Sequence, residues 1–375
     1  MSLTTHADRR THSIDTGATP SDSETVAAVE KLIEATLGSL RASWTELAAG
    51  VVPRPGVLRT DSVLELLAGL TTSGGKRLRP RMVHWGWVAA GGRSTGGYEH
   101  VVGAGAALEL LHVFALIHDD VMDRSETRRG HASVHAEARR QHVRLHALGD
   151  PQRYGENIAI LAGDLAHSEA SALMAGLPAY LQQHWRALSI ELMIGQGRDL
   201  VGAANGRRDL THAREVARAK SGAYTVWRPL QLGAAAGGAG AETFAALERY
   251  GIAVGEAFAL RDDILGVIGD EKATGKPVGD DLVAGKPTVL LALATQRFSP
   301  RWRRALARAG TEKVTANDVA ALRAELVRSG VIAEVEAMIT DAVRVATKAL
   351  DTPAIEPEAA AGLHSLAHRV AWRTA

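Results

Sequence analysis

The sequence predicts an all-α fold, a helical bundle in one domain. Apolar residues recur at helical spacing near both ends of the chain, and the middle is rich in Ala and Leu, with few segments that alternate as strands do. No repeat of fixed period and no linker divides the chain. We therefore expect one domain over residues 22–375, after a polar, disordered tail over residues 1–21.

The first helix is predicted from its N-terminal signal. Ser21 and Glu24 have the spacing of a capping box, in which each side chain bonds the other residue's backbone N–H. Apolar residues then follow at steps of three and four: Val26, Val29, Leu32, Ile33, Leu37 and Leu40. This pattern predicts an amphipathic helix that begins just after Ser21.

Two further helices are predicted near the C-terminus. Val319, Leu322 and Leu326 form one apolar stripe, which stops at Ser329-Gly330. A second stripe stops before Pro353 and is formed by Ile332, Val335, Ile339, Val343, Ala346 and Leu350. Most of the 38 glycines cluster between periodic segments, where they mark turns.

The composition excludes several classes of function. Lys plus Arg number 43 and Asp plus Glu 42, so no global field draws the chain to nucleic acid, and a bound anion must be held locally. Cysteine is absent, which excludes disulfides, thiolate nucleophiles and cysteine-ligated metal sites. No apolar run approaches the roughly eighteen residues of a spanning helix, so we expect no transmembrane segment. A cytoplasmic location is the simplest expectation for such a chain.

Three aspartates, Asp119, Asp120 and Asp123, end an apolar stretch in LIHDDVMDRSETRRG, residues 116–130. Residues four apart share a helix face, so Asp119 and Asp123 would project side by side. A hard cation such as Mg²⁺ would offset their repulsion, using one or two carboxylates together with phosphate oxygens. The alternative is a solvated helix end with ion pairs to Arg124 and Arg128. These residues alone do not decide between the two.

A second pair of adjacent aspartates, Asp262 and Asp263, also ends an apolar helical run. Each of these two groups of aspartates follows a segment that would otherwise be buried, so they are hard to explain as ordinary charged residues on the surface. Facing each other across a cavity, they could hold metal ions around a polyanion. We call the aspartates at 119, 120 and 123 the first acidic motif and those at 262 and 263 the second, and metal binding is the favoured interpretation of the two together.

Basic residues near glycine turns indicate that the polyanion is a phosphate compound. Lys76 and Arg79 follow two glycines in GGKRLRP, Lys220 opens KSGAY, and Lys276 and Lys286 lie in glycine-flanked loops. Each of them alone would more often be a surface charge. The G-x-x-x-x-G-K-[ST] spacing is missing, which disfavours a nucleoside triphosphate.

Together these stretches resemble the trans-isoprenyl diphosphate synthase (polyprenyl synthetase) family, most of all its bacterial geranylgeranyl diphosphate synthases. The resemblance covers almost the whole chain, and its motifs keep the family's order: GGKRLRP, LLHVFALIHDDVMDRSETRRG, LAGDLAHSEA, KSGAYTVWRPLQLGAA and RDDILGVIGDEKATGKPVGDDLVAGKPT. It implies an isoprenoid synthase bundle around a central substrate cavity, a homodimer and a transferase that uses three Mg²⁺ ions. The implied reaction is the head-to-tail condensation of isopentenyl diphosphate with an allylic diphosphate.

Site residues are implied by matching the family's motif positions. Isopentenyl diphosphate would be held by Lys76, Arg79, His112 and Arg129, and the allylic diphosphate by Arg128, Lys220, Lys276 and Lys286. Mg²⁺ would be bound by Asp119, Asp123 and Asp262, supported by Asp120 and Asp263. Lys220 and the three principal metal ligands are the implied catalytic residues.

The resemblance also bears on product length. Phe114 lies five residues before Asp119, a little over one turn deeper on the same helix, where its ring would form a floor beneath the growing chain. One aromatic there, with the small Ala115 beside it, is the pattern of geranylgeranyl diphosphate synthases, and Leu111 is the next candidate floor. The alternatives are a farnesyl or longer product, or an ordinary core role for Phe114.

Two positions depart from the family pattern. Gly266 stands where a further aspartate is usual, with Asp270 the next carboxylate, and Ala259 stands where a glutamine is common. Both departures favour one rival function, a non-catalytic partner subunit with the same fold. The other rival is a class I terpene cyclase, which would not need a second set of basic residues for isopentenyl diphosphate.

Overall fold

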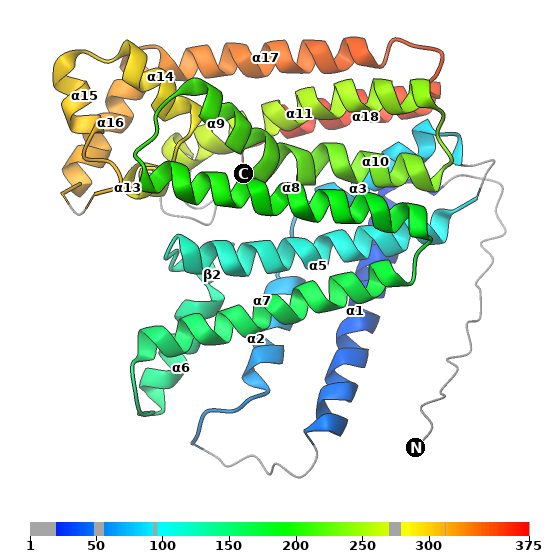
Figure 1. Cartoon of the computed structure of the whole chain (residues 1–375), viewed down its shortest axis with the longest axis horizontal. Helices are drawn as coiled ribbons and strands as arrows, with labels where there is room; N and C mark the ends of the chain where they lie inside the picture. The colour runs from blue at the N-terminus through cyan, green and yellow to red at the C-terminus, as the bar shows by residue number, and fades with distance from the viewer. Residues whose placement is uncertain (1–19, 49–55, 93–95, 270–278, 312, 375) are drawn as a thin grey trace.

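A computed structural model describes residues 20–48, 56–92, 96–269, 279–311 and 313–374, and it confirms the all-α fold (Figure 1). Residues 1–19 of the predicted tail, Asp270 and Lys276 lie outside the described residues. The helices are α1 (Asp22–Leu47), α2 (Ser62–Thr72), α3 (Leu78–Ala89), α5 (Tyr98–Met122), α6 (Val134–Arg144), α7 (Pro151–Ala175), α8 (Ala179–Ala204), α9 (Leu210–Val216), η1 (Ala217–Trp227), α10 (Arg228–Ala236), α11 (Ala241–Ile268), α13 (Asp280–Ala284), α14 (Val289–Arg297), α15 (Pro300–Leu306), α16 (Ala316–Arg328), α17 (Val331–Ala349) and α18 (Pro357–Ala371).

The predicted helix ends are confirmed at both termini of the fold. Glu24 N donates to Ser21 Oγ at 3.1 Å and Ser21 N donates to the Glu24 carboxylate at 2.7 Å, which completes the capping box of α1. Gly330 has φ 78°, a left-handed conformation that separates α16 from α17. The local rules that predict these ends therefore hold in the folded chain.

Four long helices build the centre of the bundle, α5, α7, α8 and α11, each of 25–28 residues. In Figure 1, α5 runs beside α7, and α11 runs beside α17. α5 is the one described helix that is long and apolar enough to cross a membrane by length and composition, and 67% of its apolar window is buried inside the fold. Such burial is what the central helix of a globular bundle requires.

A short hairpin follows α5 and was not predicted. β1 (Thr127–Arg128) pairs antiparallel with β2 (His131–Ala132). Arg129 and Gly130, between the strands, have φ of 53° and 77°, as the two central residues of a type I′ turn require. Arg129 thus adopts a backbone conformation that is costly for a non-glycine residue, and its side-chain contacts hold it there.

The segment η1 is a π-helix of 11 residues, a rare form found mostly at functional sites. Its neighbours approach very closely. A Cβ on Gly222 of η1 would lie 2.8 Å from the backbone carbon of Gly255 on α11, and a Cβ on Gly195 of α8 would lie 2.4 Å from the backbone nitrogen of Lys220. Because glycine has no side chain, α8 and α11 can pack closely against η1 at these crossings. This packing fixes the position of Lys220 in the bundle.

Candidate active site

One cavity of about 870 Å³ lies between α5, α8, η1, α11 and the segment that leads into α14. Its lining contains residues of both acidic motifs and most of the predicted basic residues: Asp119, Asp123, Asp262, Asp263, Arg79, His112, Arg128, Lys220 and Lys286. The structure therefore brings together side chains that lie up to 207 positions apart in the sequence, from Arg79 to Lys286.

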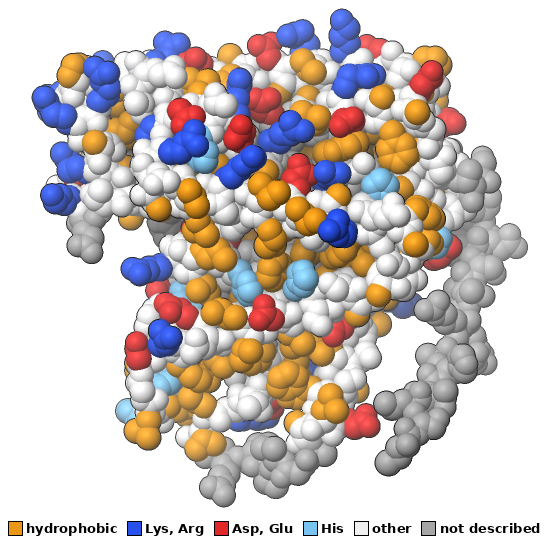
Figure 2. All heavy atoms as spheres, in the orientation of Figure 1, with side chains coloured by type: hydrophobic (Ala, Val, Ile, Leu, Met, Phe, Trp, Pro, Cys, Tyr) orange, Lys and Arg blue, Asp and Glu red, His pale blue; other side chains and the backbone are white. Residues whose placement is uncertain are grey.

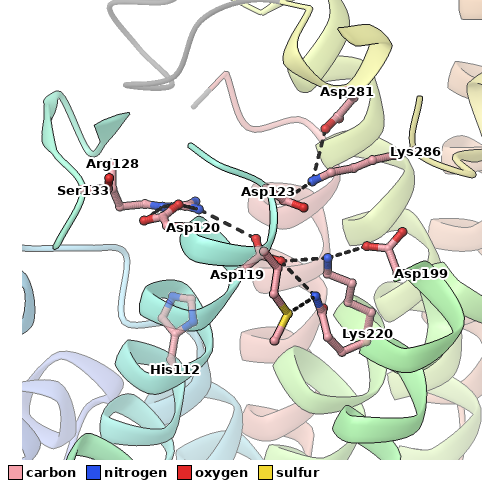
Figure 3. Close-up of polar contacts among 12 residues, drawn as sticks. His112, Asp119, Asp120, Asp123, Arg128, Ser133, Asp199, Lys220, Asp281 and Lys286 are labelled. Carbon is pink, nitrogen blue, oxygen red and sulfur yellow. Dashed lines mark hydrogen bonds and ion pairs between the residues drawn. The ribbon is translucent and has the colours of Figure 1, made fainter. Parts of the chain in front are cut away.

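Lysines neutralise the two aspartates of the first acidic motif that line the cavity, Asp119 and Asp123 (Figure 3). Lys220 Nζ lies 2.9 Å from Asp119 Oδ1 and 2.5 Å from Asp199 Oδ2, and Lys286 Nζ lies 2.6 Å from Asp123 Oδ2. Burial raises the pKa of Asp119, but the charges of Lys220 and Lys286 outweigh it and hold that pKa below its ordinary value. Asp119 is therefore ionised at neutral pH, as a metal ligand must be.

Asp120 differs from the other two aspartates of the first acidic motif. It is buried, it is not among the residues that line the cavity, and both its oxygens accept hydrogen bonds from Arg128 Nε, at 3.0 and 3.1 Å. A supporting role for Asp120 behind the metal ligands stays a prediction. Its carboxylate fixes the Arg128 guanidinium, which reaches within 3.7 Å of Asp119 Oδ2.

The two aspartates of the second acidic motif have different surroundings. Asp262 is exposed, and Arg373 near the C-terminus donates a hydrogen bond to it. Asp263 Oδ2 accepts from the backbone N–H of Val289, the first residue of α14, at 3.1 Å. Burial raises the pKa of Asp263 well above its ordinary value, and the nearby Asp281 raises it further. Asp262 is thus the accessible carboxylate, while Asp263 also holds the start of α14.

Two of the predicted isopentenyl diphosphate residues, Arg79 and His112, lie together in the cavity. Arg79 donates to Thr225 Oγ1 at 3.0 Å and lies 4.3 Å over the Tyr224 ring, whose hydroxyl is hydrogen-bonded to His112 Nδ1 at 3.0 Å. Burial lowers the pKa of His112 well below its ordinary value, and the surrounding arginines, Arg79 first, lower it further. His112 is therefore a neutral hydrogen-bonding group in a cationic environment.

Lys76 and Arg129 are not among the lining residues, and Arg129 is the one of the two whose charge acts on His112. Arg129 donates to Ser73 Oγ at 3.2 Å, and its guanidinium packs where a side chain on Gly75 would lie, 3.2 Å from an ideal Cβ. Burial lowers the pKa of Lys76, and the charge of Arg373 adds to this effect. The glycine loop before α3 therefore carries Lys76 and holds the side chain of Arg129.

The predicted floor residues lie at different depths. Ala115 lines the cavity, whereas Phe114 does not and packs against His118 and His167, with ring centroids 4.6 and 5.0 Å away. Leu111 is fully buried in the core. Phe114 therefore stands behind the cavity wall, between α5 and α7, rather than forming its surface.

Two cavity residues were missed in the sequence. Asp199 on α8 is the second partner of Lys220, and Asp281 on α13 lies 3.5 Å from Lys286. Asp199 stands between Arg198 and Leu200 in GQGRDL, and its partner Lys220 is 21 residues away, whereas Asp281 in GDDL lies five residues before its partner Lys286. Asp281 could have been found as an acidic residue within a stretch already assigned to the site, whereas Asp199 lies in none of the assigned stretches.

The donors present suit Mg²⁺ better than a softer metal. The candidate ligands are carboxylate oxygens, which hard cations prefer, and the chain has no cysteine to supply a thiolate. Among the described residues, no three carboxylate or imidazole groups converge closely enough to hold an ion by themselves. This agrees with Mg²⁺, which takes one or two carboxylates and completes its shell with water and phosphate oxygens.

Known proteins resemble this chain over most of its length. The sequence profile of the polyprenyl synthetase family matches residues 60–326. A short chain isoprenyl diphosphate synthase of Methanothermobacter thermautotrophicus is 32% identical over 298 residues, which are 78% of this chain and 84% of that protein. A geranylfarnesyl diphosphate synthase of Aeropyrum pernix is 35% identical over 244 residues, which are 62% of this chain and 70% of that protein.

The fold has solved counterparts as well. The structure of a geranylgeranyl pyrophosphate synthase from Corynebacterium glutamicum, complexed with isoprenyl diphosphate and magnesium, matches with a TM-score of 0.86 and 34% sequence identity. The match covers 94% of this chain and all of that one. With a family profile that spans most of the sequence and a cavity that carries both acidic motifs, the chain belongs to the polyprenyl synthetase family.

Proposed function

We propose that the protein is a head-to-tail prenyltransferase that condenses isopentenyl diphosphate with an allylic diphosphate. The observation that carries the proposal is the single cavity shared by both acidic motifs, in which Lys220 and Lys286 neutralise Asp119 and Asp123. A diphosphate with its metal ions would give each lysine a phosphate partner and each aspartate a cation. The charges of these aspartates and lysines are then neutralised by one another without substrate and by the metal ions and the diphosphate when substrate is bound.

Two diphosphates require two groups of cations. We assign the allylic diphosphate to Lys220, Lys286 and Arg128, which surround the first acidic motif, together with Lys276, which lies outside the described residues. We assign isopentenyl diphosphate to a second group, which consists of Arg79, the neutral His112, Lys76 and Arg129. This second cationic group argues against a terpene cyclase, which ionises one diphosphate only.

The chemistry follows from the charges of the cavity. We propose three Mg²⁺ ions, held by Asp119, Asp123 and Asp262, which would act as Lewis acids on the departing diphosphate. Lys220, Lys286 and Arg128 place positive charge beside the oxygens that gain negative charge as the allylic carbon–oxygen bond breaks.

The new carbon–carbon bond then forms away from these charges. The double bond of isopentenyl diphosphate attacks the allylic cation, and the proton that is lost passes to the released pyrophosphate. Ala115, Leu116, Leu192 and Phe258 line the apolar part of the cavity. Their role is to exclude water, which would otherwise convert the cation to an alcohol.

We propose geranylgeranyl diphosphate as the main product. Relatives named geranylgeranyl diphosphate synthase support this length, as does the small Ala115 on the cavity wall with Phe114 behind it. A geranylfarnesyl or other longer product is the second candidate, because one relative is named for it.

We also propose a cytoplasmic homodimer. Figure 2 shows hydrophobic side chains over α7 and α8, and the exposed ones include Ile160, Leu161, Ile190, Met193 and Ile194. Apolar side chains at this density on neighbouring helices suit a protein interface. Sedimentation analysis of Leu161→Glu/Ile194→Glu beside Val327→Glu, an exposed valine on α16, tests the assignment. Only the first variant should be monomeric, and a dimer in both would place the interface elsewhere.

The test of the function is an incubation with labelled isopentenyl diphosphate, each allylic diphosphate in turn, and Mg²⁺. Chain elongation is the expected result. Cyclic hydrocarbon from the allylic substrate alone would support the cyclase, and no turnover by the folded protein would support a non-catalytic subunit.

A further inference from the structure

Gly266 leaves a gap in the second acidic motif. It lies three and four residues after Asp263 and Asp262 on α11, so a side chain there would share their helix face. The first acidic motif has a carboxylate at the equivalent spacing, Asp123, and the second has none within its own helix. The second motif therefore presents no carboxylate to the cavity from this position.

Asp281 fills that gap from a different element. An ideal Cβ on Gly266 would lie 2.2 Å from Asp281 Oδ2 and 3.1 Å from its Cγ, so the carboxylate of Asp281 occupies the space of the missing side chain. Both residues line the cavity. Any residue larger than glycine at position 266 would displace this carboxylate.

The backbone holds Asp281 in this place. Gly279 N donates to Gly266 O at 2.9 Å, which ties the start of the α13 segment to α11. Gly279 has φ 95°, a conformation that favours glycine, and the chain then turns into α13 with Asp281 facing α11. The position of the carboxylate thus follows from a backbone contact and does not depend on the side chain alone.

Asp281 also shares an ion-pair partner, Lys286, with Asp123 of the first acidic motif. Lys286 Nζ lies between Asp123 Oδ2 at 2.6 Å and Asp281 Oδ1 at 3.5 Å, as Figure 3 shows. Oδ2 of Asp281, the atom at the Gly266 gap, has no ion pair or hydrogen bond among the described residues. One oxygen is therefore directed to Lys286, and the other lies at Gly266, on the face of α11 that carries Asp262 and Asp263.

We propose that Asp281 is the third carboxylate of the second acidic motif, that it binds the divalent metal ion held by Asp262, and that Gly266 is required to make room for it. The proposal rests on the proposed function for the presence of that metal. It explains how the chain can lack the usual aspartate at position 266 and still hold a complete acidic site. The competing explanation is that Asp281 only orients Lys286.

The test is an exchange of the carboxylate between the two positions. Four variants are compared with wild type: Asp281→Gly, Gly266→Asp/Asp281→Gly, Asp119→Asn and the control Asp341→Asn, an exposed aspartate on α17 that pairs with Arg344. Mg²⁺ binding is measured by calorimetry in the presence of inorganic pyrophosphate, without turnover. Circular dichroism and melting temperature check the fold of each variant.

Asp281→Gly should bind Mg²⁺ roughly ten- to a hundredfold more weakly, the usual effect of losing a group that holds or orients a metal ligand. Gly266→Asp/Asp281→Gly should regain most of this loss, because the carboxylate returns to the same place from α11. Asp341→Asn should bind as wild type does.

Two results would overturn the proposal: wild-type Mg²⁺ affinity in Asp281→Gly, or an exchange variant no better than Asp281→Gly. The second would leave Asp281 as a partner of Lys286 only, since the exchange restores the carboxylate but not that contact. Failure of the proposed function gives a different pattern, in which Asp119→Asn also binds Mg²⁺ normally or the wild type does not elongate isopentenyl diphosphate.

Discussion

Lys220 and Lys286 are the residues that make the acidic cavity stable before substrate arrives. Each reaches across from a distant segment to an aspartate of α5, and each is nearly enclosed. The sequence predicted both lysines and their aspartates, because each lies in a short motif with a recognisable composition. It did not predict Asp199 or Asp281, because a single carboxylate becomes part of a site only through its position in space.

Substitutions should separate the two diphosphate sites. Lys220→Ala should raise the KM for the allylic diphosphate and His112→Ala that for isopentenyl diphosphate, because Lys220 pairs with Asp119 of the first acidic motif whereas His112 is bonded to Tyr224 beside Arg79. Losing one charge-assisted hydrogen bond costs about 1.5–3 kcal/mol, or roughly ten- to a hundredfold. Initial rates with each substrate varied in turn measure the effect, with the exposed Lys348→Ala as control. Equal weakening of both substrates by both variants would show that the sites are wrongly assigned.

Product length should depend on the wall formed by Ala115. Ala115→Phe should shorten the product, because a ring there enters the cavity, and Phe114→Ala should lengthen it, because the space behind the wall opens toward α7. Phe298→Ala, which empties the core of another part of the fold, is the matched control. Chromatography of the dephosphorylated products decides. If Phe114→Ala gave the wild-type product, the floor would lie at another residue.

The helices differ in how far their own sequence determines them. α1 was predicted because its capping box and apolar stripe are local signals, and the same holds for α16 and α17. The π-helix η1 and the β1–β2 hairpin were not predicted. η1 depends on close crossings with α8 and α11, and the hairpin turn contains Arg129 where glycine or asparagine is usual. Tertiary contacts determine both the π-helix and the hairpin, and no local sequence pattern predicts those contacts.

Gly222→Ala tests whether these crossings hold η1 in place. The new methyl group would lie 2.8 Å from the backbone of Gly255, where neither helix can move cheaply, so we expect a loss of about 1–3 kcal/mol in the free energy of unfolding. We also expect a raised KM for the allylic diphosphate, because Lys220 shifts with η1. Gly197→Ala on α8, which meets nothing within 4 Å, is the control. Urea unfolding provides the comparison, and equal stability of the two variants would contradict this account of η1.

The whole molecule places charges from four remote segments around one cavity. The ion pairs that join them span 101 residues, from Asp119 to Lys220, and 163 residues, from Asp123 to Lys286. The family resemblance predicted that both acidic motifs share a cavity, and the structure confirms this. The pairing of each lysine with its aspartate could not be predicted, because it depends on the packing of α5, η1 and the segment before α14.

The central claim is that the cavity's aspartates bind the metal ions on which prenyl transfer depends. Elongation of labelled isopentenyl diphosphate by wild type and Asp119→Asn, each with Mg²⁺ and with excess chelator, tests it most directly. Wild type should be active with Mg²⁺ and inactive with chelator, and Asp119→Asn should be slower by orders of magnitude while its melting temperature shows a folded protein. Full turnover in excess chelator, or an Asp119→Asn rate close to that of wild type, would contradict the account.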